Sequence, residues 1–222
     1  MIDVIMDKPS QSGEELKYLV NQLPGSGWVN WTGRRAVEML REGPVLNAHS
    51  RTNKLAQMTR LELSQVLVVP WTESTWRGEG KWLPRKADHQ QGYDLTTKKS
   101  FKPDFWTKFI PFDDEWRIHG FRQRNGKIAI LRSGLKLPKE AKFHPWVKSN
   151  RLGWKISYLG GAPDSARSLA RQALDALMLD FGAVDIGVAF DGTPYVLEVN
   201  TCPGIEGNTL EMYAENIGKR LK

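Results

Sequence analysis

Three oxygen-bearing side chains that could do chemistry lie near the C-terminus, at Asp185, Glu198 and Asn200. They fall in VDIGVAFDGTPYVLEVN (184–200), whose two halves otherwise read as buried strands. Between the halves, the dipeptide Asp191-Gly192 is a strong signal for a two-residue hairpin loop. Counting outward from that loop places Asp185 directly opposite Glu198, with Asn200 on the same face. The other face is predicted to be apolar and to consist of Val184, Ile186, Val188, Phe190, Tyr195, Leu197 and Val199.

Two carboxylates that face each other in a sheet need a cation between them. Like charges in that position destabilise a sheet, because their Cβ atoms are only about 5 Å apart. Oxygen-only ligands suit Mg²⁺, which prefers one or two carboxylates together with waters and substrate phosphates. The alternative is a carboxylate pair neutralised by nearby Lys or Arg side chains. A longer turn, or Pro194 within the second strand, would shift the register and separate the three side chains.

A second hairpin is predicted in EWRIHGFRQRNGKIAILRSG (115–134), with Asn125-Gly126 as its loop. The same counting places His119 opposite Arg132 and puts Arg117 on their face. Two arginines and a histidine together favour an anion site, for phosphate oxygens or a developing acyl-phosphate charge. The alternative is an exposed face held by salt bridges, in which Glu115 also takes part.

The composition is that of an ordinary globular chain with a basic balance. Its 222 residues contain 32 Lys+Arg against 25 Asp+Glu, a net charge of +7, which favours an anionic partner. Nine tryptophans beside this charge keep nucleic acid open as a partner. No run of eighteen apolar residues and no secretory signal is found, and the one cysteine, Cys202, fits a reducing compartment. We therefore expect a cytoplasmic protein.

Local patterns predict mixed helices and strands, several of them paired as hairpins, and hence an α+β fold. Ser12 and Glu15 are spaced as a capping box for the first helix, and Gly182 is expected to end the longest one. Helices are predicted over 12–21, 33–42, 52–64, 165–181 and from about 209; strands over 66–70, 81–86, 105–110, 115–123 and 127–133; a loop over 89–100; and irregular structure over 134–163.

The predicted metal hairpin resembles that of the ATP-grasp enzymes. The resemblance consists of Asp185, the glutamate thirteen positions later in Glu-Val-Asn (198–200), and Pro203-Gly204. The sequence FGAVDI…YVLEVNT-PGIEG-T…YA resembles bacteriophage ATP-grasp proteins more closely still, and these are predicted carboxylate–amine ligases. Four further segments resemble the family in its own order: NKLAQM…VLVVPWTES, PRKADHQQGYD, KFIPFDDEWRIHGF and NRLGWKISY. Together the similar segments cover about residues 45–217.

The resemblance implies two α+β subdomains that sandwich ATP, with a much-reduced N-terminal region. Residues 1–45 would be a short N-terminal segment, and 46–222 the ATP-grasp domain. Its first lobe would be 46–110, with a lysine-led helix and a phosphate loop, and its second lobe 111–222, with the metal-binding hairpin. If a phage encodes the chain, the host cytoplasm is the expected location.

The resemblance also implies roles for individual residues. Asp185, Glu198 and Asn200 would bind Mg²⁺, for which Mn²⁺ could substitute, and Arg117 and Arg132 would stabilise charge on the γ-phosphate and acyl phosphate. Residues implied to contact ATP are Lys54, Arg85 and Lys86 near its phosphates, His89 and Gly92 in the closing loop, Lys108, Phe109 and Ile110 at the adenine hinge, and Asp113, with Asp114 as its alternative, at the ribose.

The implied activity is ligation: ATP activates a carboxylate as an acyl phosphate, which an amine then attacks. The partners would be an amino acid or other acid and a peptide or other macromolecular acceptor. The chain departs from the family in several places. The loop 89–99 has one glycine, Lys108 replaces the usual acidic hinge residue, Ala183 replaces an arginine whose role Arg132 could take, and only about 45 residues precede the similar part. The alternative function is a non-catalytic module that binds nucleotide or nucleic acid. Ligation of an amino acid to nucleic acid would combine the two. The intact metal trio favours the enzyme.

Overall fold

Two long hairpins build the central sheet of the protein, as the alternation of their residues predicts. The computed structural model describes residues 1–32, 43–48, 53–87, 102–139, 143–145 and 147–222. The first hairpin joins β7 (Phe112–Arg122) to β8 (Ile128–Pro138), and the second joins β10 (Phe181–Ala189) to β11 (Pro194–Asn200). With β9 (Trp154–Ser157) they form an antiparallel five-stranded sheet in the order β11-β10-β7-β8-β9.

Both predicted turns differ in the same way from the two-residue loops expected. Each loop has three residues and ends on a glycine with positive φ, Gly126 at 80° and Gly192 at 84°, a conformation that suits glycine. Each hairpin also contains a register shift a few residues away from the loop. It lies between His119 and Gly120 in one hairpin and between Asp185 and Ile186 in the other. The extra loop residue and the bulge cancel. The predicted pairs Asp185 with Glu198 and His119 with Arg132 are therefore confirmed.

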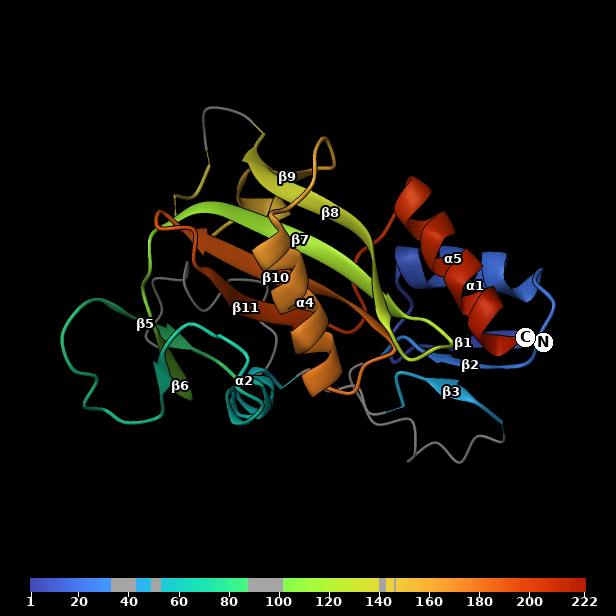
Figure 1. The fold of residues 1–222 in the computed structure, drawn as a ribbon, viewed down its shortest axis with the longest axis horizontal. Coiled ribbons are helices and arrows are strands. Elements are labelled where there is room, and N and C mark those ends of the chain that lie inside the picture. The colour runs from blue at the N-terminus through green and yellow to red at the C-terminus, as the bar shows by residue number, and fades with distance from the viewer. Residues whose placement is uncertain (33–42, 49–52, 88–101, 140–142, 146) are drawn as a thin grey trace.

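The core face of this sheet carries α4 (Asp164–Ala176), with α2 (Lys54–Leu63) beside it (Figure 1). Because of the bulge, the apolar face of the second hairpin differs from the predicted one. Val196, not Leu197, is fully buried opposite Ile186, and Phe190 is 75% exposed at the turn. The other predicted members that are buried on this face are Val184, Ile186, Val188 and Val199.

The helix predicted to be the longest, α4, is shorter than predicted, and with 13 residues it is shorter than α5 (Gly207–Leu221), which has 15. Helix α4 ends at Ala176 because Met178 has a positive φ of 54°, and Gly182 lies inside β10 rather than ending the helix. The first helix, α1 (Gln11–Asn21), is capped by Ser10, whose side chain accepts from the N–H of Gly13, and not by Ser12.

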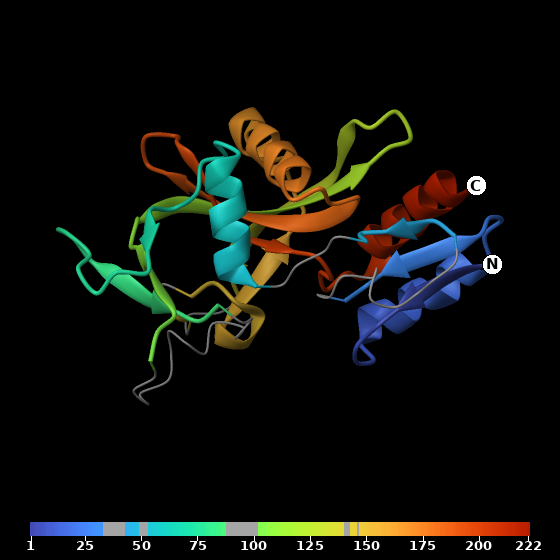
Figure 2. The same ribbon diagram turned by 90° about the horizontal axis from the view of Figure 1, so that it is seen from below.

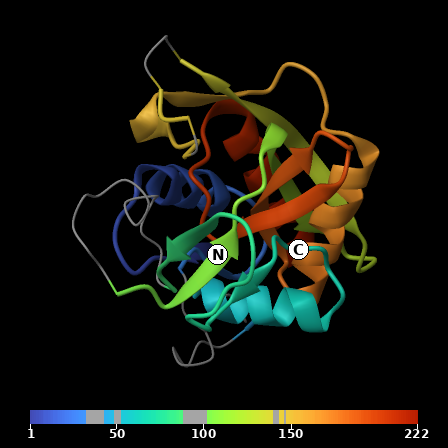
Figure 3. The ribbon, with the colours of Figure 1, turned by 90° about the vertical axis from the view of Figure 1, so that its left-hand side faces the viewer.

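A second, smaller sheet lies at one end of the molecule (Figures 1 and 2). It is antiparallel, in the order β4-β6-β5, with bounds Trp71–Thr72, Phe105–Lys108 and Trp82–Arg85. The predicted buried strand 66–70 is wrong as a regular strand. That segment is extended and forms a single bridge, Val68 to Val196, along the free edge of β11. Figure 3, which views the molecule from this end, shows the small sheet in front of the central one.

The N-terminal residues form a parallel sheet that local patterns did not predict. Its strands are β1 (Ile2–Ile5), β2 (Gly27–Asn30) and β3 (Val45–Leu46), and α1 packs against the C-terminal helix α5 (Gly207–Leu221) beside it, where both termini lie (Figure 1). These elements share a core with Phe121 and Phe181 of the central sheet.

A buried asparagine joins this N-terminal layer to the central sheet. The side chain of Asn47 accepts from the N–H groups of Asp180 and Phe181 and donates to the carbonyl of Phe181. Its own N–H donates to the Asp180 carboxylate, and its carbonyl accepts from Asn30. Because buried polar groups must be satisfied, this set of bonds fixes the two layers against each other at the start of β10.

The α+β prediction is confirmed, whereas the prediction of irregular structure over 134–163 is wrong in part. Strand β8 continues to Pro138, a 3₁₀ turn covers Asn150–Leu152, and β9 follows. The predicted helix 33–42 and loop 89–100 lie outside the described residues. In the described part of the chain, no helix is long and apolar enough to cross a membrane.

Candidate functional site: a carboxylate and arginine cluster on the open face of the central sheet

Asp185 lies at the border between the two hairpins, where β10 pairs with β7. Its register partners are Glu198 on one side and Arg117 on the other. Arg117 forms a bidentate pair with it, with Nε 2.8 Å from Oδ1 and Nη2 2.9 Å from Oδ2. This fork geometry is the strongest arrangement of an arginine and a carboxylate.

Lys136 of β8 adds a second cation to the same carboxylate. Its Nζ lies 3.0 Å from Oδ2 of Asp185 and 3.5 Å from Oε2 of Glu115, and Lys148 lies 3.6 Å from the other Glu115 oxygen. All these side chains are largely buried. The structure therefore contains the arrangement given above as the alternative to a metal ion: arginine and lysine side chains neutralise Asp185.

The pKa values of this cluster follow from the competition between burial and charge. Burial alone would raise the pKa of the Asp185 carboxyl, but Arg117 and Lys136 outweigh it and hold that pKa well below its usual range. Burial likewise opposes the charge of Lys136, yet Asp185 and Glu115 raise its pKa. The same carboxylate raises the pKa of Arg117. All three groups are ionised at neutral pH.

Glu198 lies on the next strand and meets the helix that Lys54 begins. Lys54 is the first residue of α2, and its Nζ lies 3.4 Å from Oε2 of Glu198. Gln57, one turn later, bonds both backbone groups of Val199, donating to its carbonyl at 3.0 Å and accepting from its N–H at 3.3 Å. The amide of Gln57 thus replaces a strand partner at the free edge of β11 and fixes Glu198 beside Lys54.

Asn200 completes the predicted trio, and its Nδ2 is buried without a hydrogen-bond partner among the described residues. A buried donor without a partner is costly, and an oxygen atom of a bound ligand would satisfy it. In the described part of the chain, no three His, Cys, Asp or Glu side chains gather closely enough to hold a metal ion by themselves. Two carboxylates and an amide do fit Mg²⁺ when phosphate oxygens and waters supply the other ligands.

His119 is fully buried behind this cluster, between two tyrosines. Its Nδ1 lies 3.2 Å from the hydroxyl of Tyr213, and its Nε2 lies 3.3 Å from the hydroxyl of Tyr158. Burial, together with the charge of Arg117, lowers its pKa to about 3. His119 is therefore neutral at physiological pH and adds no charge to the predicted anion site.

Arg132 has neutral partners, in contrast to Arg117. Its Nη1 donates to Oγ1 of Thr209 at 2.8 Å, and its Cζ lies 3.8 Å from the centre of the Tyr158 ring. No carboxylate lies at ion-pair distance from it in the described part of the chain. Its charge is thus available to an incoming anion.

The predicted nucleotide residues are spread over the small sheet and the connection to β7. Arg85 ends β5, Lys86 pairs with Asp104 at 3.1 Å, and Asp113 is exposed on β7, where the register with β10 shifts. His89 and Gly92 lie outside the described residues.

The backbone of the predicted adenine hinge is already partly used. The N–H of Lys108 donates to the carbonyl of Pro70 at 2.7 Å, and that of Phe109 donates to Lys81 at 2.8 Å. Ile110 packs against the main core. A contact with adenine through the first two N–H groups would require those bonds to break, so the remaining backbone groups are the better candidates.

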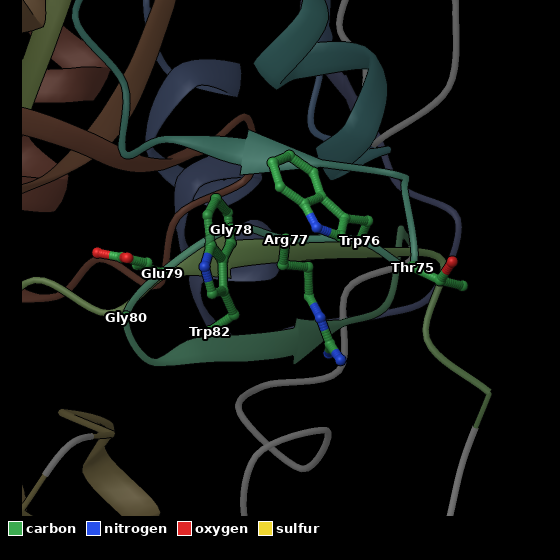
Figure 4. Close-up of a pocket in the computed structure, with 7 residues that line it drawn as sticks. All are labelled: Thr75, Trp76, Arg77, Gly78, Glu79, Gly80 and Trp82. Carbon is green, nitrogen blue, oxygen red and sulfur yellow. The ribbon is translucent and has the colours of Figure 1, made fainter.

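A surface hollow of about 640 Å³ lies in the connection between β4 and β5 (Figure 4). None of the predicted site residues lines it. Its lining residues are Thr75, Trp76, Arg77, Gly78, Glu79, Gly80 and Trp82. We therefore place the candidate site on the face of the central sheet opposite α4, which we call the open face, and not in this hollow.

Sequence reasoning missed three residues that the structure brings into the cluster: Lys136, Lys148 and Tyr158. A signal for Lys136 existed, because the register predicted for the first hairpin places it opposite Glu115 when it is extended two residues beyond the predicted hairpin end at Gly134. Lys148 and Tyr158 lie in the segment predicted to be irregular, and no local pattern pointed to them.

Comparisons with known proteins identify the fold. No family model matches the chain, and no curated protein matches it. Among solved structures, the D-alanine–D-alanine ligase of Bacillus anthracis is 14% identical, with a TM-score of 0.59 over 99% of this chain and 94% of that one. The ATP-grasp ligase PsnB, solved with a minimal precursor, is 13% identical, with a TM-score of 0.61 over 93% and 92%.

A third similar structure is the carboxyaminoimidazole ribonucleotide synthase of Aspergillus clavatus complexed with ATP, which is 12% identical, with a TM-score of 0.59 over 83% of this chain and 58% of that one. The chain spans about half the length of the synthetases of this type that it matches, from 49% to 58% of each. Together these likenesses show that the chain has the ATP-grasp fold, as its sequence predicts.

Proposed function

We propose that this protein is an ATP-dependent ligase that joins a carboxylate to an amine. The observation that carries the proposal is the pair of opposed side chains Asp185 and Glu198 in an ATP-grasp sheet, together with Arg132, whose partners are neutral. Four cations (Lys54, Arg117, Lys136 and Lys148) pair with three acids (Glu115, Asp185 and Glu198), and Arg132 has neutral partners. This excess of positive charge favours a polyanionic substrate such as ATP.

The proposed reaction has two steps that balance in atoms and charge. A carboxylate oxygen attacks the γ-phosphorus of ATP, the bond from that phosphorus to the bridging oxygen breaks, and ADP leaves with the bonding electrons. The amine nitrogen then attacks the acyl carbon, phosphate leaves, and the nitrogen releases one proton. Positioning and charge stabilisation can supply most of the acceleration of such steps.

Each charged residue has a proposed task in these steps. Lys54, at the start of α2, holds the phosphates, and Arg132 stabilises the charge that develops on the transferred group. Arg117 instead holds Asp185 in place, because both of its contacts are with that carboxylate. Arg85, Lys86, Lys108, Phe109, Ile110 and Asp113, with His89 and Gly92, stay predictions for nucleotide contacts.

Asp185, Glu198 and Asn200 are the residues that would hold Mg²⁺ in this proposal. The ion would neutralise phosphate charge and orient the phosphates. The chain's own contribution is to place Glu198 and Asn200 on the same edge strand. Gln57 fixes that strand through the backbone of Val199. Mn²⁺, with similar oxygen ligands, is the expected substitute.

The finer parts of the proposal concern the substrates and the setting. One substrate would be an amino acid, and the acceptor would be a peptide or other macromolecule. The proposal also includes a similarity to bacteriophage ligases and a cytoplasmic location. The basic balance of the chain supports an acidic acceptor in particular.

Calorimetry of ATP binding tests the proposal. The native chain should bind ATP in the presence of Mg²⁺, and Glu198→Gln should weaken binding at least tenfold, whereas Glu211→Gln, an exposed glutamate on α5, should not. Replacing Mg²⁺ with EDTA should have the effect of Glu198→Gln. Absence of binding by the native chain would overturn the proposal.

One observation favours the alternative function, a non-catalytic module that binds nucleotide or nucleic acid. Because Arg117, Lys136 and Lys54 neutralise the opposed carboxylates, those carboxylates do not need a metal to remain in the fold. Retention of the trio is therefore weaker support for catalysis than the sequence suggested. Binding of single-stranded nucleic acid with a steep dependence on salt, and no binding of ATP, would favour this alternative.

A further inference from the structure

The two arginines of the site are held in different ways. Arg117 faces the carboxylate of Asp185, which neutralises its charge. Arg132 lies over the ring of Tyr158, 3.8 Å from its centre, and donates to the hydroxyl of Thr209. An aromatic ring attracts a guanidinium through its quadrupole and leaves the positive charge in place. Arg132 is thus fixed without being neutralised.

Tyr158 is itself fixed by a chain of hydrogen bonds with one direction. The hydroxyl of Tyr213 donates to the carbonyl of Gly182 at 3.1 Å, and it has only one proton to give. Its contact with Nδ1 of His119 must therefore be donated by the histidine. Nε2 is then the acceptor, and the hydroxyl of Tyr158 donates to it.

This series of hydrogen bonds cannot transfer a proton from one end to the other at neutral pH. His119 is fully buried, and the charged groups that act on it are Arg117, Arg132 and Asp185, two of which disfavour its protonation. The imidazole therefore serves as a fixed acceptor for Tyr158. The arrangement is suited to holding a group in position and not to acid–base catalysis.

We propose that Tyr158 is a positioning residue: its ring, fixed by His119 and Tyr213, orients the guanidinium of Arg132 toward phosphoryl oxygens while leaving its charge available. The phosphoryl ligand rests on the proposed function, since it would belong to ATP or to the acyl phosphate. The orientation of Arg132 by the ring does not depend on that function.

The orientation is tested by NMR on the native chain without ligand. The Nε–H signal of Arg132, assigned by its loss in Arg132→Lys, should be shifted upfield by the ring current of Tyr158. Tyr158→Phe keeps the ring and should keep most of this shift, whereas Tyr158→Leu should abolish it. An unchanged signal in Tyr158→Leu would overturn the proposal.

The consequence for binding is tested with MgATP by calorimetry. Tyr158→Leu should weaken binding about three- to tenfold, Tyr158→Phe less than twofold, and the control Tyr18→Leu, an exposed tyrosine of α1, should leave it unchanged. In an Arg132→Ala background, Tyr158→Leu should have no further effect, because the ring acts through that arginine. Equal losses in both backgrounds would overturn the proposal.

The two tests separate this inference from the proposed function. If the native chain does not bind MgATP while the Arg132 signal responds to Tyr158→Leu, the ligase proposal fails and the orientation of Arg132 stands. If MgATP binds but the signal does not respond, the positioning role fails alone. Thermal unfolding of each variant identifies any that does not fold. If Tyr158→Leu does not fold, Tyr158→Met, which also removes the ring, takes its place in both tests with the same expected results.

Discussion

The two hairpins of the central sheet have the same backbone design and opposite charge. Each closes with a three-residue loop that ends on a glycine and restores its register with a bulge. The open face of the β7–β8 hairpin carries three cations, Arg117, Arg132 and Lys136, beside one buried acid, Glu115, whereas that of the β10–β11 hairpin carries Asp185 and Glu198. The similarity comes from turn chemistry, and the difference is in side chains alone.

This difference explains how so many charges remain in a largely buried place. The sheet order sets β7 beside β10, so the cationic hairpin meets the acidic one and Asp185 faces Arg117. Charges taken out of water are costly unless they are paired and hydrogen-bonded. Each hairpin therefore supplies what the other requires, and cations remain in excess for a polyanion.

The largest expected effect comes from removing one side of this pairing. Arg117→Met leaves the buried carboxylate of Asp185 with Lys136 as its remaining cation, which should cost about 3–5 kcal/mol of unfolding free energy. Urea unfolding measures the change. The double variant Arg117→Met with Asp185→Leu should recover most of the loss, because no charge is left unpaired. A double variant as unstable as the single one would contradict the pairing.

The next effect concerns His119, the neutral member of the cationic hairpin. Its pKa in the folded chain, about 3, lies below its ordinary value of 6.5, so its contribution to stability is present above pH 6.5 and is lost as pH falls. The native chain should lose about 1.4 kcal/mol per pH unit below 6.5, or about 2 kcal/mol at pH 5.

His119→Gln, which can donate and accept but cannot ionise, should be less sensitive to pH between 6.5 and 5. The acidic hairpin should not respond in that window, because the lowered pKa of Asp185 places its loss of stability below the ordinary pKa of 3.8. Equal slopes for the native chain and His119→Gln in urea unfolding would contradict the burial of a neutral histidine.

A smaller effect is expected when the charge excess is reduced. Without ATP, the cations of the first hairpin should oppose a divalent ion at the second. Lys136→Met removes the ammonium 3.0 Å from Asp185 and should strengthen binding of Mn²⁺ without nucleotide about tenfold. Titration by electron paramagnetic resonance measures it, and Lys155→Met, an exposed lysine of β9, serves as the control. No difference between the two variants would show that Lys136 does not set metal affinity.

The smallest effect is expected where the two hairpins are alike. Deleting the exposed Phe190 leaves Asp191-Gly192 as a two-residue loop between the same paired strands. The free energy of unfolding should change by less than about 1 kcal/mol, a shift of a few degrees in Tm. Deleting Arg124, which leaves Asn125-Gly126, should do the same. A large loss in either would show that the three-residue loop itself is required.

The outcome for the hairpins shows why part of the site could be predicted. Alternation fixed which residues share a face, and the Asp-Gly and Asn-Gly dipeptides located the turns. The loop length was wrong by one residue in each hairpin, and a bulge of one residue cancelled the error before Asp185 and His119. The predicted pairs are thus confirmed although the turns are not.

Other elements could not be found because their signals are not local. Strands β1 and β2 have four residues each, too few for a reliable period, and they are stabilised by parallel pairing across α1. The end of α4 depends on Met178 adopting a positive φ, and Asn47 carries a buried set of bonds to residues more than 130 positions away. Neither feature has a recognisable pattern in the residues around it.

The sequence by itself determined the α+β class, the two hairpins and the side chains on their open faces, because these depend on period and on turn residues within a few positions. Only the tertiary structure decided that the two hairpins lie edge to edge, that Asp185 is neutralised by Arg117 and Lys136, and that Arg132 lies over the ring of Tyr158. Those contacts join strands far apart in the chain. The pairing of Asp185 is favoured because a buried carboxylate without cations is costly, and Arg117 and Lys136 reach it only once these strands are assembled.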